Sequence, residues 1–316
     1  MKSSVLAVVA FGFVGLLGCS RNNIEAVNRA NEGDKARSSG SIDEAISKYE
    51  QGVRLDPTNH RIFWKMAQAH LKKPDWEKVA DACKGAARAA ETGSKNKVIH
   101  ANYYNLQGHA LRMLAEKGKA QWADVKGPLE TAIKADPNIA DAYVDLAEAN
   151  LFLDEEQQAL QNLTTAIEKR PTSVGFFGYL ADLYLDLGLN DQAEAVLNEG
   201  LSFASQATGE AEEVSNAKFI LHSMLGQVKQ NKGDTSAAMQ KYKEAKAACG
   251  ECRKPGQAVA YYNIGFVNFT SGNKDEAILN LKNFHKIAGC KAGKATYKFE
   301  CDMTTSIVSK LGGVLN

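Results

Sequence analysis

Two stretches of the chain decide its fold: residues 143–171, YVDLAEANLFLDEEQQALQNLTTAIEKRP, and residues 177–205, FGYLADLYLDLGLNDQAEAVLNEGLSFAS. The second stretch repeats the residue types of the first at an interval of 34 residues. A unit of this length cannot bury its own apolar face and must stack on copies of itself. The period therefore predicts a solenoid, whose long surface binds partners more often than it forms a reaction centre.

The repeated positions are an aromatic residue, a Leu-Ala pair, an Ala, a Leu and a small residue. In the two stretches they are Tyr143 and Phe177, Leu146-Ala147 and Leu180-Ala181, Ala159 and Ala193, Leu163 and Leu197, and Ala166 and Gly200. This pattern resembles the tetratricopeptide repeat (TPR), a family with two antiparallel helices per repeat. The resemblance extends over seven units, although the first helix of the first unit, around Ala30 to Arg37, matches weakly. It implies an all-α, right-handed superhelical solenoid of about seven TPR helix pairs with a C-terminal capping helix.

The physical pattern agrees with this fold. Apolar residues recur three and four positions apart, which is the stripe of a core-facing helix. Glycine at the helix junctions fits a residue of positive φ just past a helix end; these glycines are Gly40, Gly188, Gly233 and Gly272. Small residues would let the two helices of a pair approach closely; they are Ala67, Gly108, Ala147, Ala181, Gly226 and Gly265.

The N-terminus has the pattern of an export signal. Residues 1–19 combine Lys2, a short apolar stretch and the sequence Leu16-Leu17-Gly18-Cys19, which resembles the bacterial lipobox. The resemblance implies cleavage before Cys19 and acylation of that residue, and Ser20 then implies transfer to the outer membrane. We expect a lipid anchor in its inner leaflet, facing the periplasm. The alternative is an ordinary secretory signal with a chance cysteine.

The expected domain order follows from these patterns. It is a lipoprotein signal peptide at 1–19, a short tether at 20–25, the TPR solenoid at 26–290 and a disulfide-pinned capping segment at 291–316. The last segment has a helical apolar face, formed by Met303, Ile307, Val308 and Leu311. A terminal repeat exposes an apolar side that such a helix would cover. The alternative is a helix that docks on a partner.

Composition argues against several functional classes. Once Lys2 is removed with the signal, 37 basic and 37 acidic residues remain, and no basic run predicts nucleic-acid binding. The six histidines are scattered, and no metal-ligand spacing, phosphate loop or nucleophile motif is present. We therefore expect no enzyme activity, no metal and no cofactor.

The cysteines divide into three groups. Cys19 is the lipidation candidate, and Cys83 lies where the repeat needs a buried apolar residue. The other four, Cys249, Cys252, Cys290 and Cys301, could bind zinc, but export favours disulfides. We favour the pairs Cys249–Cys252 and Cys290–Cys301; the alternative is Cys252–Cys290 with Cys249–Cys301.

The TPR resemblance also implies which side chains line the concave groove, because the first helix of each pair faces it. The early part of the groove has amide, basic and aromatic groups that suit an extended peptide: Trp64, Lys65, Gln68, Asn102, Asn105, His109 and Arg112. The middle is acidic and would attract a basic segment: Asp141, Asp145, Glu148, Asp182 and Asp186. The late part is aromatic, with Tyr262, Phe266 and Phe269. The alternative is a merely solvated surface, with Phe266 and Phe269 in contact with the cap.

These features predict a lipid-anchored TPR scaffold or adaptor that binds protein partners during assembly of an envelope complex, of the pilotin-like or the motility and secretion type. The first alternative is a peptidoglycan-associated structural or hydrolase-adaptor protein. A thiol redox protein using the four C-terminal cysteines is a weaker alternative.

Overall fold

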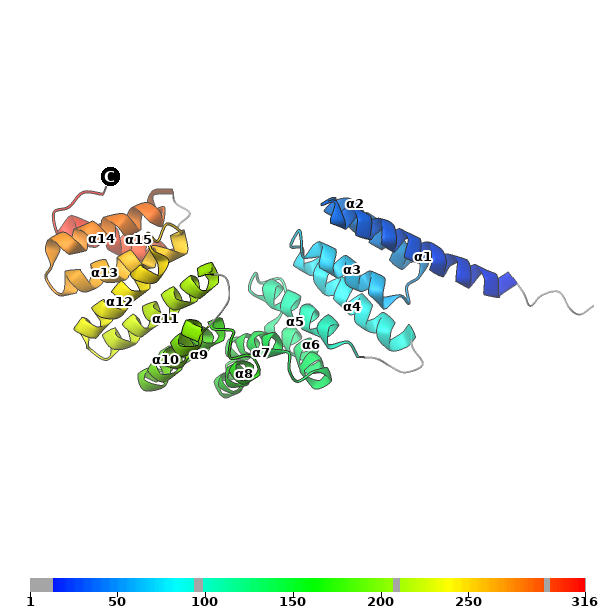
Figure 1. The fold of residues 1–316 in the computed structure, drawn as a ribbon, viewed down its shortest axis with the longest axis horizontal. Helices are drawn as coiled ribbons and strands as arrows, with labels where there is room; N and C mark the ends of the chain where they lie inside the picture. The colour runs from blue at the N-terminus through cyan, green and yellow to red at the C-terminus, as the bar shows by residue number, and fades with distance from the viewer. Residues whose placement is uncertain (1–13, 94–98, 207–210, 293–295, 316) are drawn as a thin grey trace, which may run out of the picture. The chain divides into compact units, whose positions relative to one another are not determined.

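The computed structural model describes residues 14–93, 99–206, 211–292 and 296–315. These residues form fifteen α-helices and two short 3₁₀ helices, and they contain no strand (Figure 1). The predicted all-α fold is confirmed. The chain divides after Lys169 into two compact units, residues 1–169 and 170–316.

Unit 1 contains four helix pairs. In each pair, two successive helices make their most extensive contacts with each other. The pairs are α1 (Val14–Ser38) with α2 (Ile42–Leu55), α3 (His60–His70) with α4 (Trp76–Gly93), α5 (Ala101–Ala115) with α6 (Trp122–Ala135), and α7 (Ala140–Phe152) with α8 (Glu156–Lys169).

Unit 2 contains three further pairs and a final helix. They are α9 (Gly175–Asp186) with α10 (Asn190–Gln206), α11 (Ala211–Asn231) with α12 (Thr235–Cys249), α13 (Val259–Thr270) with α14 (Lys274–Ile287), and then α15 (Lys298–Lys310). The 3₁₀ helix η1 (Pro255–Gln257) precedes α13, and the 3₁₀ helix η2 (Cys290–Ala292) follows α14. The seven predicted pairs and the additional C-terminal helix are therefore present in the described residues.

In a helix pair, a small residue of the first helix lies in close contact with an apolar side chain of the second helix. A Cβ built on Gly226 would lie 2.3 Å from the ring of Tyr242, and one built on Gly265 would lie 2.8 Å from Leu281. In both pairs the apolar residue follows the glycine after 16 positions. Because these distances leave no room for a methyl group, the two helices can approach this closely only at a glycine.

The first pair is built in the same way, which the sequence analysis missed. A Cβ on Gly33 would lie 2.6 Å from the ring of Tyr49, again 16 positions on, and Tyr49 is fully buried. The Tyr49 hydroxyl donates a hydrogen bond of 2.7 Å to Asp34 Oδ1. The 16-residue spacing from Tyr49 was the signal that identifies Gly33 as the small residue of this pair.

The predicted turn chemistry is also present. Gly40 and Gly233 have φ values of +83° and +80°, a region that side chains with a Cβ rarely adopt. After Gly233, the Asp234 carboxylate accepts a hydrogen bond of 2.9 Å from the Ala237 amide and caps the start of α12.

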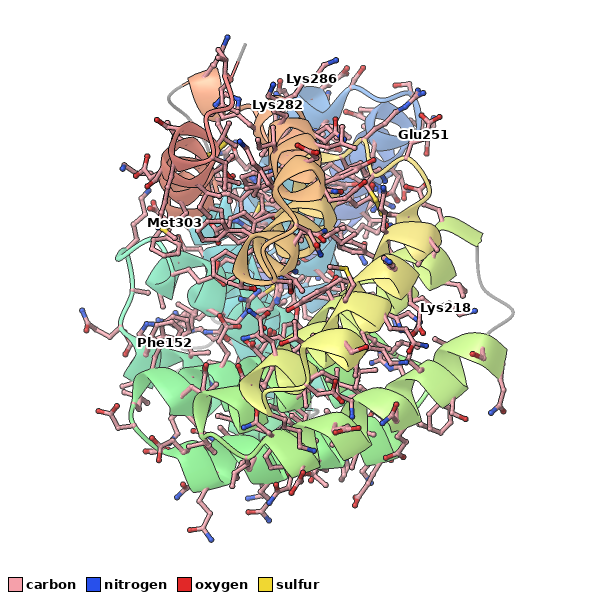
Figure 2. The ribbon with its side chains drawn as sticks, turned by 90° about the vertical axis from the view of Figure 1, so that its left-hand side faces the viewer. Phe152, Lys218, Glu251, Lys282, Lys286 and Met303 are labelled. Carbon is pink, nitrogen blue, oxygen red and sulfur yellow. A yellow bond between two sulfur atoms is a disulfide. The ribbon has the colours of Figure 1, made fainter. Side chains whose placement is uncertain are left out.

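Helix α15 covers the last repeat. Ile307 and Val308 are buried in a cluster with Leu281, against which Phe266 and Phe269 pack. Met303, labelled on α15 in Figure 2, packs against the same cluster. Of the two interpretations of this aromatic group, contact with the cap is the correct one, so Phe266 and Phe269 are not free to line a peptide groove.

The structure contains two disulfides near the C-terminus. Cys249 is bonded to Cys252, and Cys290 is bonded to Cys301 at the start of α15, with Cα–Cα distances of 5.0 and 5.5 Å. These are the two pairs that the sequence analysis favoured. Cys83 is a free and fully buried thiol in the core, and burial raises its pKa to about 12.

The structure describes only part of the N-terminal segment for which we predicted an export signal and a tether. Residues 1–13 of the expected signal lie outside the described residues. The backbone of Cys19 is helical, and residues 20–25, the expected tether, form part of α1. This segment contains no Gly or Pro that would interrupt a helix. No helix of the described residues is long and apolar enough to cross a membrane.

The close contact between Gly226 and Tyr242 can be tested with a matched pair of substitutions. We expect Gly226→Ala to lower the free energy of unfolding by about 1–3 kcal/mol, because the new methyl group overlaps the Tyr242 ring. Gly178→Ala, in the same unit, places its Cβ 3.9 Å from its nearest neighbours and should be neutral or stabilising by up to about 1 kcal/mol. Urea denaturation of both variants measures the two changes in the free energy of unfolding. Equal changes would show that the Gly226 contact does not limit how closely α11 and α12 approach.

Candidate functional site

Side chains of successive first helices meet on one face of unit 1. We call this the first-helix face; it is formed by α1, α3, α5 and α7, of which α1 contacts α3 and α5 contacts α7. Asp34 on α1 forms an ion pair with Lys65 on α3, and Arg37 donates a hydrogen bond of 3.3 Å to the Gln68 Oε1 atom. The predicted peptide contacts Lys65 and Gln68 are therefore both engaged in joining α1 to α3.

A second group of polar side chains joins α5 to α7, centred on Arg112. Its Nε atom lies 2.8 Å from Asp145 Oδ1, and its Nη1 atom lies 2.9 Å from Glu148 Oε2. His109 Nδ1 lies 2.9 Å from Asp145 Oδ2, and Glu116 completes the group with an ion pair to Arg112. We call these five residues the Arg112 network.

The spacing of the residues explains how the network forms. His109 and Arg112 lie three positions apart on α5, as do Asp145 and Glu148 on α7, so each pair shares one face of its helix. The Arg112 and Asp145 side chains are only 13% and 10% exposed, which weakens screening by water.

The charges of the network shift two pKa values. Burial opposes the charged form of Arg112, but its carboxylate neighbours, Asp145 first, outweigh burial and raise the pKa of the guanidinium. Burial raises the pKa of Glu148, and the nearby Glu116 adds to that effect while Arg112 opposes it. His109 and Arg112, which we predicted as peptide-groove residues, therefore have their charged and polar groups engaged in holding the first helices of two successive repeats together.

Asn105 has a hydrogen-bond acceptor that is not used within the described residues. It lies one turn before His109 on α5, and its Oδ1 atom is buried without a hydrogen-bond partner among the described residues. The nearby Asn102 is exposed on the same helix. An unmet buried acceptor costs about 1–3 kcal/mol, which a donor supplied by a ligand would recover.

The aromatic part of the face was only partly predicted. The Trp64 ring on α3 lies 4.9 Å from the Tyr103 ring on α5. The Tyr103 hydroxyl lies 2.8 Å from His60 Nδ1, and the His60 ring stacks at 4.9 Å on His100. Burial, followed by the charges of His100 and Arg61, lowers the pKa of His60. His60, His100 and Tyr103 were not among the predicted site residues. Each of them lies at or beside the start of a first helix, which was the available signal.

The predicted acidic middle is divided between the two units. Asp141, Asp145 and Glu148 belong to unit 1, and the last two lie in the Arg112 network. Asp182 and Asp186 lie one helical turn apart on α9 in unit 2, where burial and then the charge of Asp186 raise the pKa of Asp182. Two carboxylates at this spacing repel each other mildly.

Metal binding has no support in the part of the chain that the structure describes. No group of three or more His, Cys, Asp or Glu side chains is arranged there to hold a metal ion.

Removal of Arg112 should expose the role of its network. We expect Arg112→Met to lower the free energy of unfolding by about 3 kcal/mol, because Asp145 would remain buried without its cation. The matched control is Lys119→Met, whose ion pair with Glu77 is about 60% exposed on both sides and should contribute less than about 1 kcal/mol. Chemical denaturation measures both, and an Arg112→Met loss no larger than that of the control would show that the network does not hold α5 to α7.

Comparison with known proteins identifies the repeats. One family model, described as TPR repeat, matches residues 33–73, and a second, described as tetratricopeptide repeat, matches residues 154–211.

Solved structures share the fold at low sequence identity. A tetratricopeptide repeat protein from Parabacteroides merdae matches with a TM-score of 0.60 and 13% identity, over 90% of this chain and 99% of that one. The C-terminal part of a TPR repeat-containing protein from Cytophaga hutchinsonii gives 0.59 and 15%, over 86% and 98%. PilW, a widely conserved type IV pilus biogenesis factor, gives 0.50 and 14%, over 70% and 92%. The chain therefore carries tetratricopeptide repeats on the fold of a TPR solenoid, a scaffold for protein–protein interaction.

Proposed function

We propose that this protein is a lipid-anchored TPR adaptor that binds an extended segment of a protein partner on the first-helix face of unit 1 during assembly of an envelope complex. The observation that carries the proposal is Asn105, whose buried amide oxygen has no hydrogen-bond partner among the described residues, on a face where Lys65, Gln68 and Glu148 are paired.

The chemistry of the face supports an extended peptide as the ligand. A peptide in extended conformation presents N–H donors and C=O acceptors along its length, and an Asn side chain can serve both. The Trp64 and Tyr103 rings offer apolar surface for a side chain of the partner. The Arg112 network holds α5 and α7 in place, so the face requires little ordering when it binds.

The proposed anchor rests on the sequence Leu16-Leu17-Gly18-Cys19. Two or more acyl chains on Cys19 give stable attachment, whereas one chain gives only marginal binding. We place the protein in the inner leaflet of the outer membrane, facing the periplasm. Within the class of envelope adaptors we favour a pilotin-like role. The pilus biogenesis factor PilW offers a precedent in fold.

A second candidate function has one observation in its favour. The Trp122 and Phe152 rings stack at 4.0 Å with an interplanar angle of 4°, and Phe152 (labelled in Figure 2) is 60% exposed. An exposed aromatic ring can also cover the apolar face of a sugar, so contact with peptidoglycan, as a structural or hydrolase-adaptor protein, is the alternative.

The anchor can be tested by metabolic labelling with a palmitate analogue. We expect the wild type and Cys83→Ala to be labelled and to fractionate with the outer membrane, and Cys19→Ser to lose both label and membrane association, because Cys19 is the acyl acceptor. Cys83→Ala is the matched control, since it removes the free thiol in the core. Label retained by Cys19→Ser would rule out the proposed anchor.

The binding face can be tested by site-specific photocrosslinking in intact cells. A photoreactive residue at Asn102, exposed on α5, should crosslink a component of an envelope assembly, and one at Glu130, exposed on α6, should not. Asn105→Ala should lower the yield from position 102 about two- to tenfold, which corresponds to one hydrogen bond of about 0.5–1.5 kcal/mol.

Two results would contradict this function. One is an equal yield of the same product from positions 102 and 130. The other is an unchanged yield in Asn105→Ala. A product that contains glycan rather than protein would favour the alternative function.

A further inference from the structure

A hollow in unit 2 has a lining of cationic and hydrogen-bonding side chains. It lies beside α14 and η2, has a volume of about 360 Å³, and reaches Gly289 between these elements and Leu315 near the C-terminus. Its polar lining is Lys282, Asn283, His285, Lys286 and Lys291, and no carboxylate is among the lining residues.

The lysines of the hollow have no carboxylate partner in the part of the chain that the structure describes. No described residue forms an ion pair with Lys282, Lys286 or Lys291. Some lysines elsewhere in the unit do have carboxylate partners: Lys229 lies 2.5 Å from Glu194, and Lys241 lies 2.8 Å from Glu244. What sets the hollow apart is that three lysines without such a partner line one cavity, with no carboxylate among its lining residues.

The arrangement of the lysines concentrates their positive charge. Lys282 and Lys286, both labelled on α14 in Figure 2, are four positions apart and share one face of the helix. Like charges at that spacing repel by about 0.2–0.5 kcal/mol. The helix dipole favours a cation in the last turn, which accounts for Lys286. It does not account for Lys282, a turn earlier, or for Lys291, beyond the helix.

The remaining polar groups of the hollow can donate hydrogen bonds. Asn283 provides an amide N–H₂ group. Burial and then the charge of Lys291 lower the pKa of His285, so its imidazole is neutral at pH 7 and keeps one N–H donor.

The ligand that fits these groups is an anion with several oxygens and more than one negative charge. A carboxylate carries a single charge and would leave two lysines unbalanced. A phosphate monoester carries about −1.5 to −2 near neutral pH and has three acceptor oxygens. Lysine binds phosphate as a point charge and needs no bidentate geometry.

We propose that the hollow beside α14 is a binding site for a phosphate group, with Lys282, Lys286 and Lys291 as its cations. The site is separate from the first-helix face and does not depend on the adaptor function. Its phosphate can come from a small phosphate ester or from a phospholipid headgroup.

Calorimetric titration of the full-length protein tests the site. The probes are inorganic phosphate, glycerol 3-phosphate as a soluble monoester, and phosphatidylcholine vesicles that contain phosphatidic acid, whose headgroup is also a monoester. We expect at least one probe to bind with one site per chain. Preference for glycerol 3-phosphate would identify a small ester as the source, and preference for the vesicles with phosphatidic acid would identify a lipid headgroup.

The decisive comparison uses two triple variants with the same change in net charge. Lys282→Gln/Lys286→Gln/Lys291→Gln should weaken binding of the preferred probe at least tenfold. The control, Lys218→Gln/Lys243→Gln/Lys274→Gln, removes three lysines of unit 2 that do not line the hollow and should bind as the wild type does. Circular dichroism of each variant verifies the fold. Absence of binding by the wild type, or an equal loss in both triple variants, would overturn the proposal.

Discussion

The close approach of two helices at a small residue is the contact on which the rest of this structure depends. Where Gly226 meets Tyr242 and Gly33 meets Tyr49, the space beside the glycine is filled by the aromatic ring of the second helix. The contact recurs with the same 16-residue spacing in three pairs, at Gly33, Gly226 and Gly265, and with a 21-residue spacing between Gly108 and Leu129. Regular pairs place their first helices side by side within a unit, and side chains far apart in the sequence then come within bonding distance.

The polar side chains of the first helices therefore have two different roles. Arg112 and Asp145 are mostly buried and stabilise the packing of α5 on α7. Asn105, on the same helix as Arg112, has a buried acceptor without a partner among the residues that the structure describes. A binding surface of a repeat protein is best sought among groups of the second kind, because paired charges must first lose their internal partners before they can bind a ligand. The same reasoning distinguishes the lysines beside α14 from the paired lysines elsewhere in unit 2.

The end of the repeat array shows how one residue pattern can serve two purposes. Phe266 and Phe269 have the spacing and chemistry of an aromatic peptide site, yet they pack against the cluster that contains Ile307 and Val308 of α15. A terminal repeat lacks a following copy, so its apolar side must be covered. Helix α15 provides that cover, and the Cys290–Cys301 disulfide ties its first turn to η2.

The sequence alone determined the helix pairs, the glycine turns such as Gly233 and the burial of Cys83, because all of these depend on spacing within one repeat or on local backbone geometry. The sequence did not identify Gly33 as the small residue of the first pair, because the first helix of that repeat matches the family pattern weakly. The spacing of 16 positions between Gly33 and Tyr49 was nevertheless a signal. Only the tertiary structure decided which charged groups are paired. Arg112 could equally have been solvated or bound to a ligand, until the packing of α5 against α7 placed Asp145 2.8 Å from it. Short-range spacing determines helices, but the partner of a side chain depends on contacts between repeats that no local pattern encodes.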